Sequence, residues 1–169
     1  MALRLRTFLL IVVAGLCPTE SARASYFHVP LSVHIDTSTC IVVARLIDPR
    51  SDKPLTGTRW KTRTLKVESI VWSFKETGTS LRLEWRSRRA SEDRYLSLAG
   101  KRVLWLLKPN GDGSLGIDHP GRAISLEDPA EIEHHLRELR ETRDPSPRTR
   151  LVARYLESQL PFRSGLQPR

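Results

Sequence analysis

Three residues near the start of the chain have the side-chain types of a nucleophilic site. His34, Asp36 and Cys40 lie close together in the sequence, and a Cys thiolate activated by His and oriented by Asp can attack a carbonyl group. Cys40, however, opens an apolar, β-branched run, and free Cys is among the most buried residue types. We therefore expect Cys40 to pack in the core and the protein not to be an enzyme. A Cys-dependent hydrolase is the alternative.

A second cluster of potential ligands lies in a polar stretch near the C-terminus. Glu131 and His135 are four residues apart, as are His134 and Glu138, and this spacing can bind a metal ion on a helix. His134 and His135 are adjacent, so their directions differ by about 100° around a helix. We therefore expect a solvated helix face, with no metal ligand and no cofactor.

Basic residues are concentrated in one alternating segment, residues 81–88. Leucine and tryptophan occupy one face of this segment, and charged residues occupy the other, which is the pattern of a half-buried strand. A row of positive charge can bind lipid headgroups, cell-wall polymer or polysaccharide. The candidate residues for such a polyanion site are Arg82, Arg86, Arg88 and Arg89.

Aromatic residues among these basic strands also suggest a nucleic-acid site. Proteins that bind single-stranded nucleic acid on basic strands stack the bases on aromatic rings and pair the phosphates with Arg. The alternation places Trp85 with Leu81 and Leu83, away from the arginine row, so we expect its ring in the core. Nucleic acid is therefore an alternative partner, and it is disfavoured if the chain is exported.

The N-terminal segment, residues 1–24, has the pattern of a secretory signal peptide. Arginines open it, an apolar run of residues 8–17 follows, and small residues precede an expected cleavage site between Ala24 and Ser25. The apolar run is shorter than the roughly 20 residues that span a bilayer. We expect an exported protein, periplasmic or secreted, whose mature form does not span the membrane.

Length and composition restrict the mature part to one domain. The chain has 169 residues, a formal net charge of +9 and two Cys, of which only Cys40 follows the expected cleavage site. No internal disulfide can then form, and burial must stabilise the fold. Most of the positive charge precedes residue 126, whereas the remainder is balanced and helix-like in composition.

The chain before residue 126 reads as a succession of strands. Continuous apolar runs predict strands that are buried on both faces, whereas alternating runs predict strands with one solvated face. Turn residues separate these runs at hairpin-like spacing, and no helical pattern intervenes. This favours the mainly β class, as a small antiparallel barrel or a sandwich, and we expect the barrel. The expected strands are residues 39–47, 60–74, 81–88, 102–108, 115–117 and 122–126.

Two helices are expected after the strands. Asp128 and Pro129 form a typical helix start, with Glu131 placed for a capping box, and this helix should extend to Arg143. The stretch 144–147 ends it and starts a second helix, which Pro161 ends. The predicted organisation is a signal peptide (1–24), a barrel domain (25–126), a helical pair (127–160) and a flexible tail (161–169).

The order of these pieces resembles small exported bacterial proteins with a netrin-like barrel of the OB type, the fold of the tissue inhibitors of metalloproteinases. The resemblance covers residues 38–126 and rests on three stretches: Cys-Ile-Val-Val-Ala-Arg-Leu at 40–46, Leu-Lys-Val-Glu-Ser-Ile-Val-Trp at 65–72 and Gly-Lys-Arg-Val-Leu-Trp-Leu-Leu at 100–107. It implies a secreted, non-catalytic interaction module. The inhibitors chelate zinc through an N-terminal Cys, and the expected mature terminus here is Ser25, so that activity does not carry over.

Overall fold

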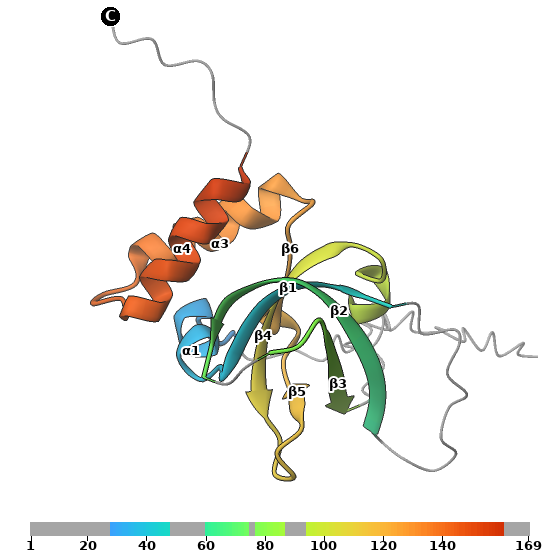
Figure 1. The fold of residues 1–169 in the computed structure, drawn as a ribbon. Coiled ribbons are helices and arrows are strands. Elements are labelled where there is room, and N and C mark those ends of the chain that lie inside the picture. The colour runs from blue at the N-terminus through green and yellow to red at the C-terminus, as the bar shows by residue number, and fades with distance from the viewer. Residues whose placement is uncertain (1–27, 48–59, 75–76, 87–93, 161–169) are drawn as a thin grey trace, which may run out of the picture.

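A β-barrel with helices on one side makes up the part of the chain that the computed structural model describes, residues 28–47, 60–74, 77–86 and 94–160 (Figure 1). The helices contain about as many residues as the strands, so the expected class, mainly β, holds only for the barrel itself. In chain order the elements are α1 (Leu31–Asp36), β1 (Cys40–Leu46), β2 (Trp60–Ser73), β3 (Ser80–Arg86), β4 (Arg102–Pro109), β5 (Leu115–Ile117), the 3-10 turn η2 (Pro120–Arg122), β6 (Ala123–Ser125), α3 (Pro129–Glu141) and α4 (Pro147–Gln159).

Five strands close the barrel, and the sixth extends its wall. The strand order is β1-β2-β3-β5-β4, and β4 pairs again with β1, so that the sheet has no free edge within this ring. β6 adds to β4 as an extra strand. The pairing of β3 with β5 is parallel, and the expectation of an antiparallel barrel is therefore wrong at this one contact. Hairpin-like spacing cannot reveal it, because the two strands are distant in sequence.

All six expected strands are confirmed, but the expected absence of helix from this region is wrong. The helix α1 precedes β1, and residues 94–97 form a further helical turn between β3 and β4. α1 has only six residues, and Pro30 at its N-cap provides no side-chain hydrogen bond. So short a helix is marginal on its own, and contacts from distant parts of the chain stabilise it, as described below.

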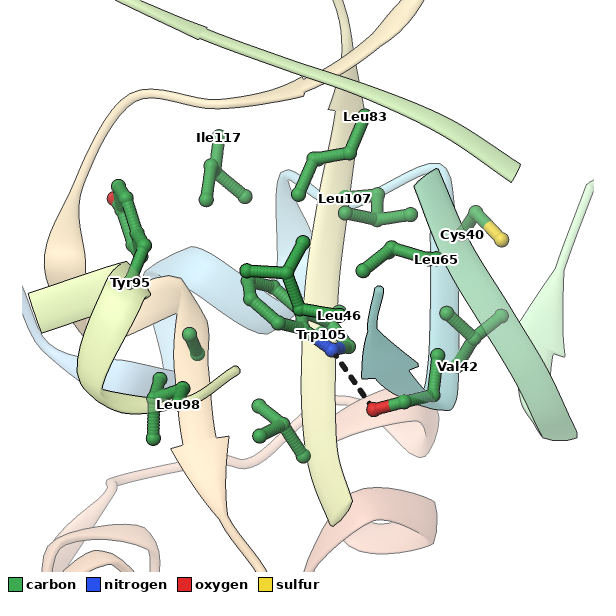
Figure 2. Close-up of a cluster of buried hydrophobic side chains, with 13 residues drawn as sticks. Cys40, Val42, Leu46, Leu65, Leu83, Tyr95, Leu98, Trp105, Leu107 and Ile117 are labelled. Atoms are coloured by element: carbon green, nitrogen blue, oxygen red, sulfur yellow. Dashed lines mark hydrogen bonds between the residues drawn. The ribbon is translucent and has the colours of Figure 1, made fainter. Parts of the chain in front are cut away.

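The barrel interior is one of two apolar cores. Trp105 of β4 lies at its centre, fully buried, and its indole Nε1 donates a 3.1 Å hydrogen bond to the carbonyl oxygen of Ala44 on β1 (Figure 2). This bond satisfies the polar atom of a buried ring. Tyr95 and Leu98, from the helical turn after β3, pack into the same core, and the other members shown include Cys40, Val42, Leu46, Leu65, Leu83, Leu107 and Ile117.

The second core lies outside the barrel wall, between the wall and the helices. Ile41 and Val43 of β1 and Leu104 and Leu106 of β4 point outward, opposite to their interior neighbours, and all four are fully buried. Figure 1 shows α1, α3 and α4 on this side of the barrel. The apolar residues of the helices that cover the wall are Leu31, Ile35, Ile132, Leu136, Leu139, Val152 and Leu156.

Both C-terminal helices begin as predicted. The carboxylate of Asp128 accepts hydrogen bonds from the amides of Ala130 and Glu131, and the hydroxyl of Ser146 accepts one from the amide of Thr149. Glu131 does not complete a capping box in the expected way. Its Oε1 accepts a hydrogen bond from the Ser125 amide instead, which links α3 to β6.

Several predictions concern segments outside the described residues. These are the signal peptide (1–24) with its cleavage site at Ala24 and Ser25, and the tail 161–169. They remain predictions. Within the described part of the chain, none of the helices combines the length and hydropathy needed to cross a membrane.

Candidate functional site

The outer face of the β2–β3 pair is the part of the barrel wall that carries the predicted basic row. Arg82 of β3 lies opposite Thr64 of β2. Two residues further along β2, Lys66 lies opposite Ser80. The side chain of Arg82 is 70% exposed, whereas Leu83 is fully buried in the barrel interior. The predicted alternation of this strand is therefore confirmed at these positions. We call this outer surface, which includes Thr64, Lys66, Arg82 and Glu84, the open face.

The charge of Arg82 is partly compensated on the open face itself. Its Nη2 lies 3.2 Å from Oε1 of Glu84, whose side chain is only 17% exposed. The other carboxylate oxygen of Glu84 accepts a 3.1 Å hydrogen bond from the hydroxyl of Ser114. The open face thus presents charges of both signs among its described residues, as the alternation of Arg82 and Glu84 with leucine in the sequence indicated.

A hollow of about 380 Å³ lies at the border between the open face and the turn that joins β4 to β5. It is lined by Glu84, Asn110, Gly111 and Asp112. The hydroxyl and the amide of Ser114 both donate hydrogen bonds to the carboxylate of Asp112, which lowers its pKa and keeps it ionised. Two carboxylates, those of Glu84 and Asp112, therefore line the hollow, and the guanidinium of Arg82 is paired with one of them.

Gly116 of β5 makes the tight packing beside this hollow possible. A Cβ atom at this position would lie 2.6 Å from Oδ1 of Asn110 and 2.8 Å from the carbonyl oxygen of Glu84. Only glycine allows β3 and the side chain of Asn110 to approach β5 so closely. No local pattern in the sequence indicates this hollow, because the parallel β3–β5 contact is what brings Glu84 to residues 109–113.

The remaining members of the predicted basic row cannot be placed. The backbone of Arg86 ends β3, but its side chain lies outside the described part of the structure, as do Arg88 and Arg89 entirely. The rings of Trp60 and Trp85 are likewise outside it. Of the four candidate residues, Arg82 alone has a described side chain.

The two other tryptophans are not available for stacking against bases. Trp105 is fully buried in the barrel. The ring of Trp72 carries the guanidinium of Arg148 at 3.5 Å from its centroid, and it packs edge to face against Phe74. A base would have to displace Arg148 to stack on Trp72.

The structure separates the residues of the predicted nucleophilic group. Cys40 is buried in the barrel core, with its Sγ 3.7 Å from the hydroxyl of Thr77. The carboxylate of Asp36 accepts hydrogen bonds from the hydroxyls of Ser146 and Thr149 on α4. Neither contact involves His34, so the arrangement that a thiolate nucleophile requires is absent among these residues.

His34 belongs instead to a buried polar group beside η2. Its Nε2 lies 3.1 Å from Nδ1 of His119, and its carbonyl oxygen accepts a hydrogen bond from Arg122. Burial, reinforced by the neighbouring positive charge of Arg122, lowers the pKa of His34 to about 4. His34 is therefore neutral at pH 7, and it contributes to packing rather than to a charged site.

The cluster on α3 is more compact than the sequence suggested. One ligand atom from each of His134, His135 and Glu138 lies within 4.8 Å of the others, although adjacent histidines on a helix were expected to diverge. Burial lowers the pKa of His135, and the carboxylates of Glu131 and Glu138 act in the opposite direction. The Cα–Cβ bonds of His134 and His135 point in different directions, but the ring atoms of the two side chains still lie close to Glu138.

Comparison with known proteins adds no assignment. The chain matches no protein-family model, no curated protein and no solved structure.

Proposed function

We propose that this chain is an exported, non-catalytic binding module with an OB-type, netrin-like barrel that contacts its ligand through the open face and the adjoining hollow. Barrels of the OB type bind ligands on the surface of strands 2 and 3 and on the loop between strands 4 and 5. In this chain the corresponding surface contains Arg82, Glu84 and Asp112.

The strand order is the observation that carries this proposal. β1 pairs with both β2 and β4, and β3 runs parallel to β5, which is the connectivity of a five-stranded OB barrel. A helical turn at residues 94–97 lies between β3 and β4. The helices α3 and α4 cover the β1–β4 wall and the Trp72 end of β2, and among the described residues the rest of the β2–β3 wall has no helix over it.

The absence of a catalytic arrangement among the described residues supports a binding role. Cys40, His34 and Asp36 are held by separate partners, and the Ser114 hydroxyl beside the hollow is bonded to carboxylates with no described histidine or lysine among its contacts. Charges of both signs on the open face favour a polar partner that offers both donors and acceptors.

Site-directed photocrosslinking in the bacterial host tests the binding surface. A photoreactive amino acid replaces Thr64 or Arg82 on the open face, or Arg137 or Arg154 on the exposed side of the helices. The proposal expects a discrete adduct in the envelope or medium from the first two positions only. Adducts solely from the helical positions, or none from any position, would contradict it. The intact mass of the recovered protein tests export, because cleavage leaves Ser25–Arg169.

Polyanion binding is a second candidate, favoured by the exposure of Arg82 and by the outward position of Lys66 beside it. The variant in which Arg82, Arg86, Arg88 and Arg89 are all replaced by Ser should lose salt-sensitive retention on heparin or a comparable anionic matrix. A control variant removes the same charge from the helices by replacing Arg137, Arg143, Arg150 and Arg154 with Ser. Equal retention of both variants would exclude this function.

A further inference from the structure

A group of histidine and glutamate side chains on α3 is not used by the proposed binding surface. His134 is exposed, whereas the side chains of His135 and Glu138 are 15% and 19% exposed. Their three ligand atoms lie within 4.8 Å of one another. Two ligands at 2.0–2.1 Å from a tetrahedral metal ion are about 3.3 Å apart, so small side-chain rotations would bring all three atoms to ligand distance.

The buried nitrogen of His135 is the observation that distinguishes this cluster from an ordinary charged helix face. Its Nδ1 is buried and has no hydrogen-bond partner among the described residues. Oε2 of Glu138 lies 3.6 Å from this nitrogen, an ion-pair contact that is slightly too long for a hydrogen bond. A buried ring nitrogen whose contact to Glu138 is this loose still has room for a tighter partner, such as a metal ion held between the two side chains.

The surroundings of His135 fit a metal-ligating imidazole. Its other nitrogen, Nε2, faces the carboxylate of Glu131 at 4.0 Å. Histidine ligands commonly direct their second ring nitrogen to a carboxylate, which fixes the tautomer and leaves the first nitrogen free to bind the metal. Glu131 is itself held by Arg94 and by the Ser125 amide, so this carboxylate is fixed in position.

Glu138 is also oriented by a neighbour. Its Oε1 accepts a 2.6 Å hydrogen bond from the Leu31 amide at the start of α1, which leaves Oε2 on the side of His135. His28, in the segment before α1, places its Nε2 3.7 Å from the same Oε1. The carboxylate therefore has one oxygen fixed by the backbone and one available as a ligand.

We propose that His134, His135 and Glu138 form a binding site for a divalent transition-metal ion of the Zn²⁺ class, with Glu131 orienting His135 from behind. Two imidazoles and one carboxylate are ligands that Zn²⁺ and Co²⁺ accept, and water completes the coordination. The site would connect α3 to the start of α1 through Glu138. This inference does not depend on the ligand of the open face.

Cobalt titration of the full chain, purified without a polyhistidine tag and freed of metal with a chelator, tests the site. Four-coordinate Co²⁺ gives visible absorption bands, which Zn²⁺ should abolish on displacement. The wild type is expected to saturate at one equivalent. H134A removes an exposed ligand and should weaken binding at least 10-fold, as should E138Q. E141Q, which removes a carboxylate from the same helix outside the cluster, should bind like the wild type.

Two results would overturn the proposal. One is the failure of the wild type to bind one equivalent of Co²⁺ or Zn²⁺ at micromolar concentrations. The other is unchanged affinity in H134A. If circular dichroism shows that E138Q is unfolded because the Leu31 amide has lost its acceptor, H134A alone decides, since His134 is exposed and its replacement leaves the packing intact.

Discussion

The two halves of the barrel wall differ in what lies on their outer surface. β1 and β4 are buried on both faces, because α1, α3 and α4 cover them from outside. β3 alternates between interior leucine and outward charge, with Leu83 fully buried and Arg82 largely exposed. The outer surface of β1 and β4 is therefore part of a core, whereas the outer surface of β3 is exposed at Arg82.

Two arginine residues stabilise the covered half of the wall, in contrast to the exposed Arg82. Arg148 of α4 stacks on Trp72 and donates hydrogen bonds to the carbonyl oxygens of Ile35, Asp36 and Ser38 at the C-terminal end of α1. Arg122, which is 4% exposed, binds the carbonyl oxygen of His34 from the other side. These cations stabilise the covered half, so a high net positive charge in this chain is not by itself a sign of a polyanion site.

The largest effect is expected from a cavity in the covered half. Leu104→Ala removes a fully buried side chain of β4 that faces the helices, and it should lower the free energy of unfolding by about 2–5 kcal/mol. Urea denaturation measures this. A loss below about 1 kcal/mol would mean that the helices do not form a true second core with the wall.

Removal of the Arg148 side chain, which binds the C-terminal end of α1, should have the next largest effect. Arg148→Ala abolishes its hydrogen bonds to three carbonyl groups and its contact with Trp72, and should cost about 2–3 kcal/mol. Arg150→Ala, on the same helix and exposed, is the matched control and should cost under about 0.5 kcal/mol. Similar losses in both variants would remove the distinction between the two kinds of arginine.

Acid should weaken the covered half through His34. Its pKa is about 4 in the folded protein and 6.5 in the unfolded chain, so only the unfolded chain takes up a proton between these values. The contribution of this group is therefore fully present above pH 6.5 and falls as the pH decreases toward 4, by up to about 3 kcal/mol. Between pH 6.5 and 4 the free energy of unfolding should fall more steeply with decreasing pH in the wild type than in His34→Gln. An equal dependence on pH in the two proteins would contradict the lowered pKa of His34.

The smallest effect is expected on the open face. Arg82→Ser removes a mostly exposed side chain and one ion pair with Glu84, and it should change the free energy of unfolding by no more than about 0.5 kcal/mol. A loss above about 1 kcal/mol would show that this face also contributes to the fold, which would weaken the comparison between the two halves.

The sequence predicted the barrel and the paired helices because each depends on a local pattern. The continuous apolar runs at β1 and β4 indicated burial on both faces, and Asp128 with Pro129 indicated the start of α3. α1 escaped prediction because it is short and is stabilised by Arg122 and Arg148, which lie far away in the sequence. The hollow and the convergence of His135 with Glu138 depend on tertiary contacts and on side-chain direction, which residue spacing does not specify.

The position of β1 in the ring has a consequence for the rate of folding. β1 pairs with β2, which follows it in sequence, and also with β4, where Ile41 lies opposite Leu106. The second pairing must enclose all of the intervening chain, and contacts between residues so distant in sequence form slowly because loop closure costs entropy. The covered half of the wall should therefore assemble late in refolding, and it should be the last part to exchange its amide hydrogens once formed.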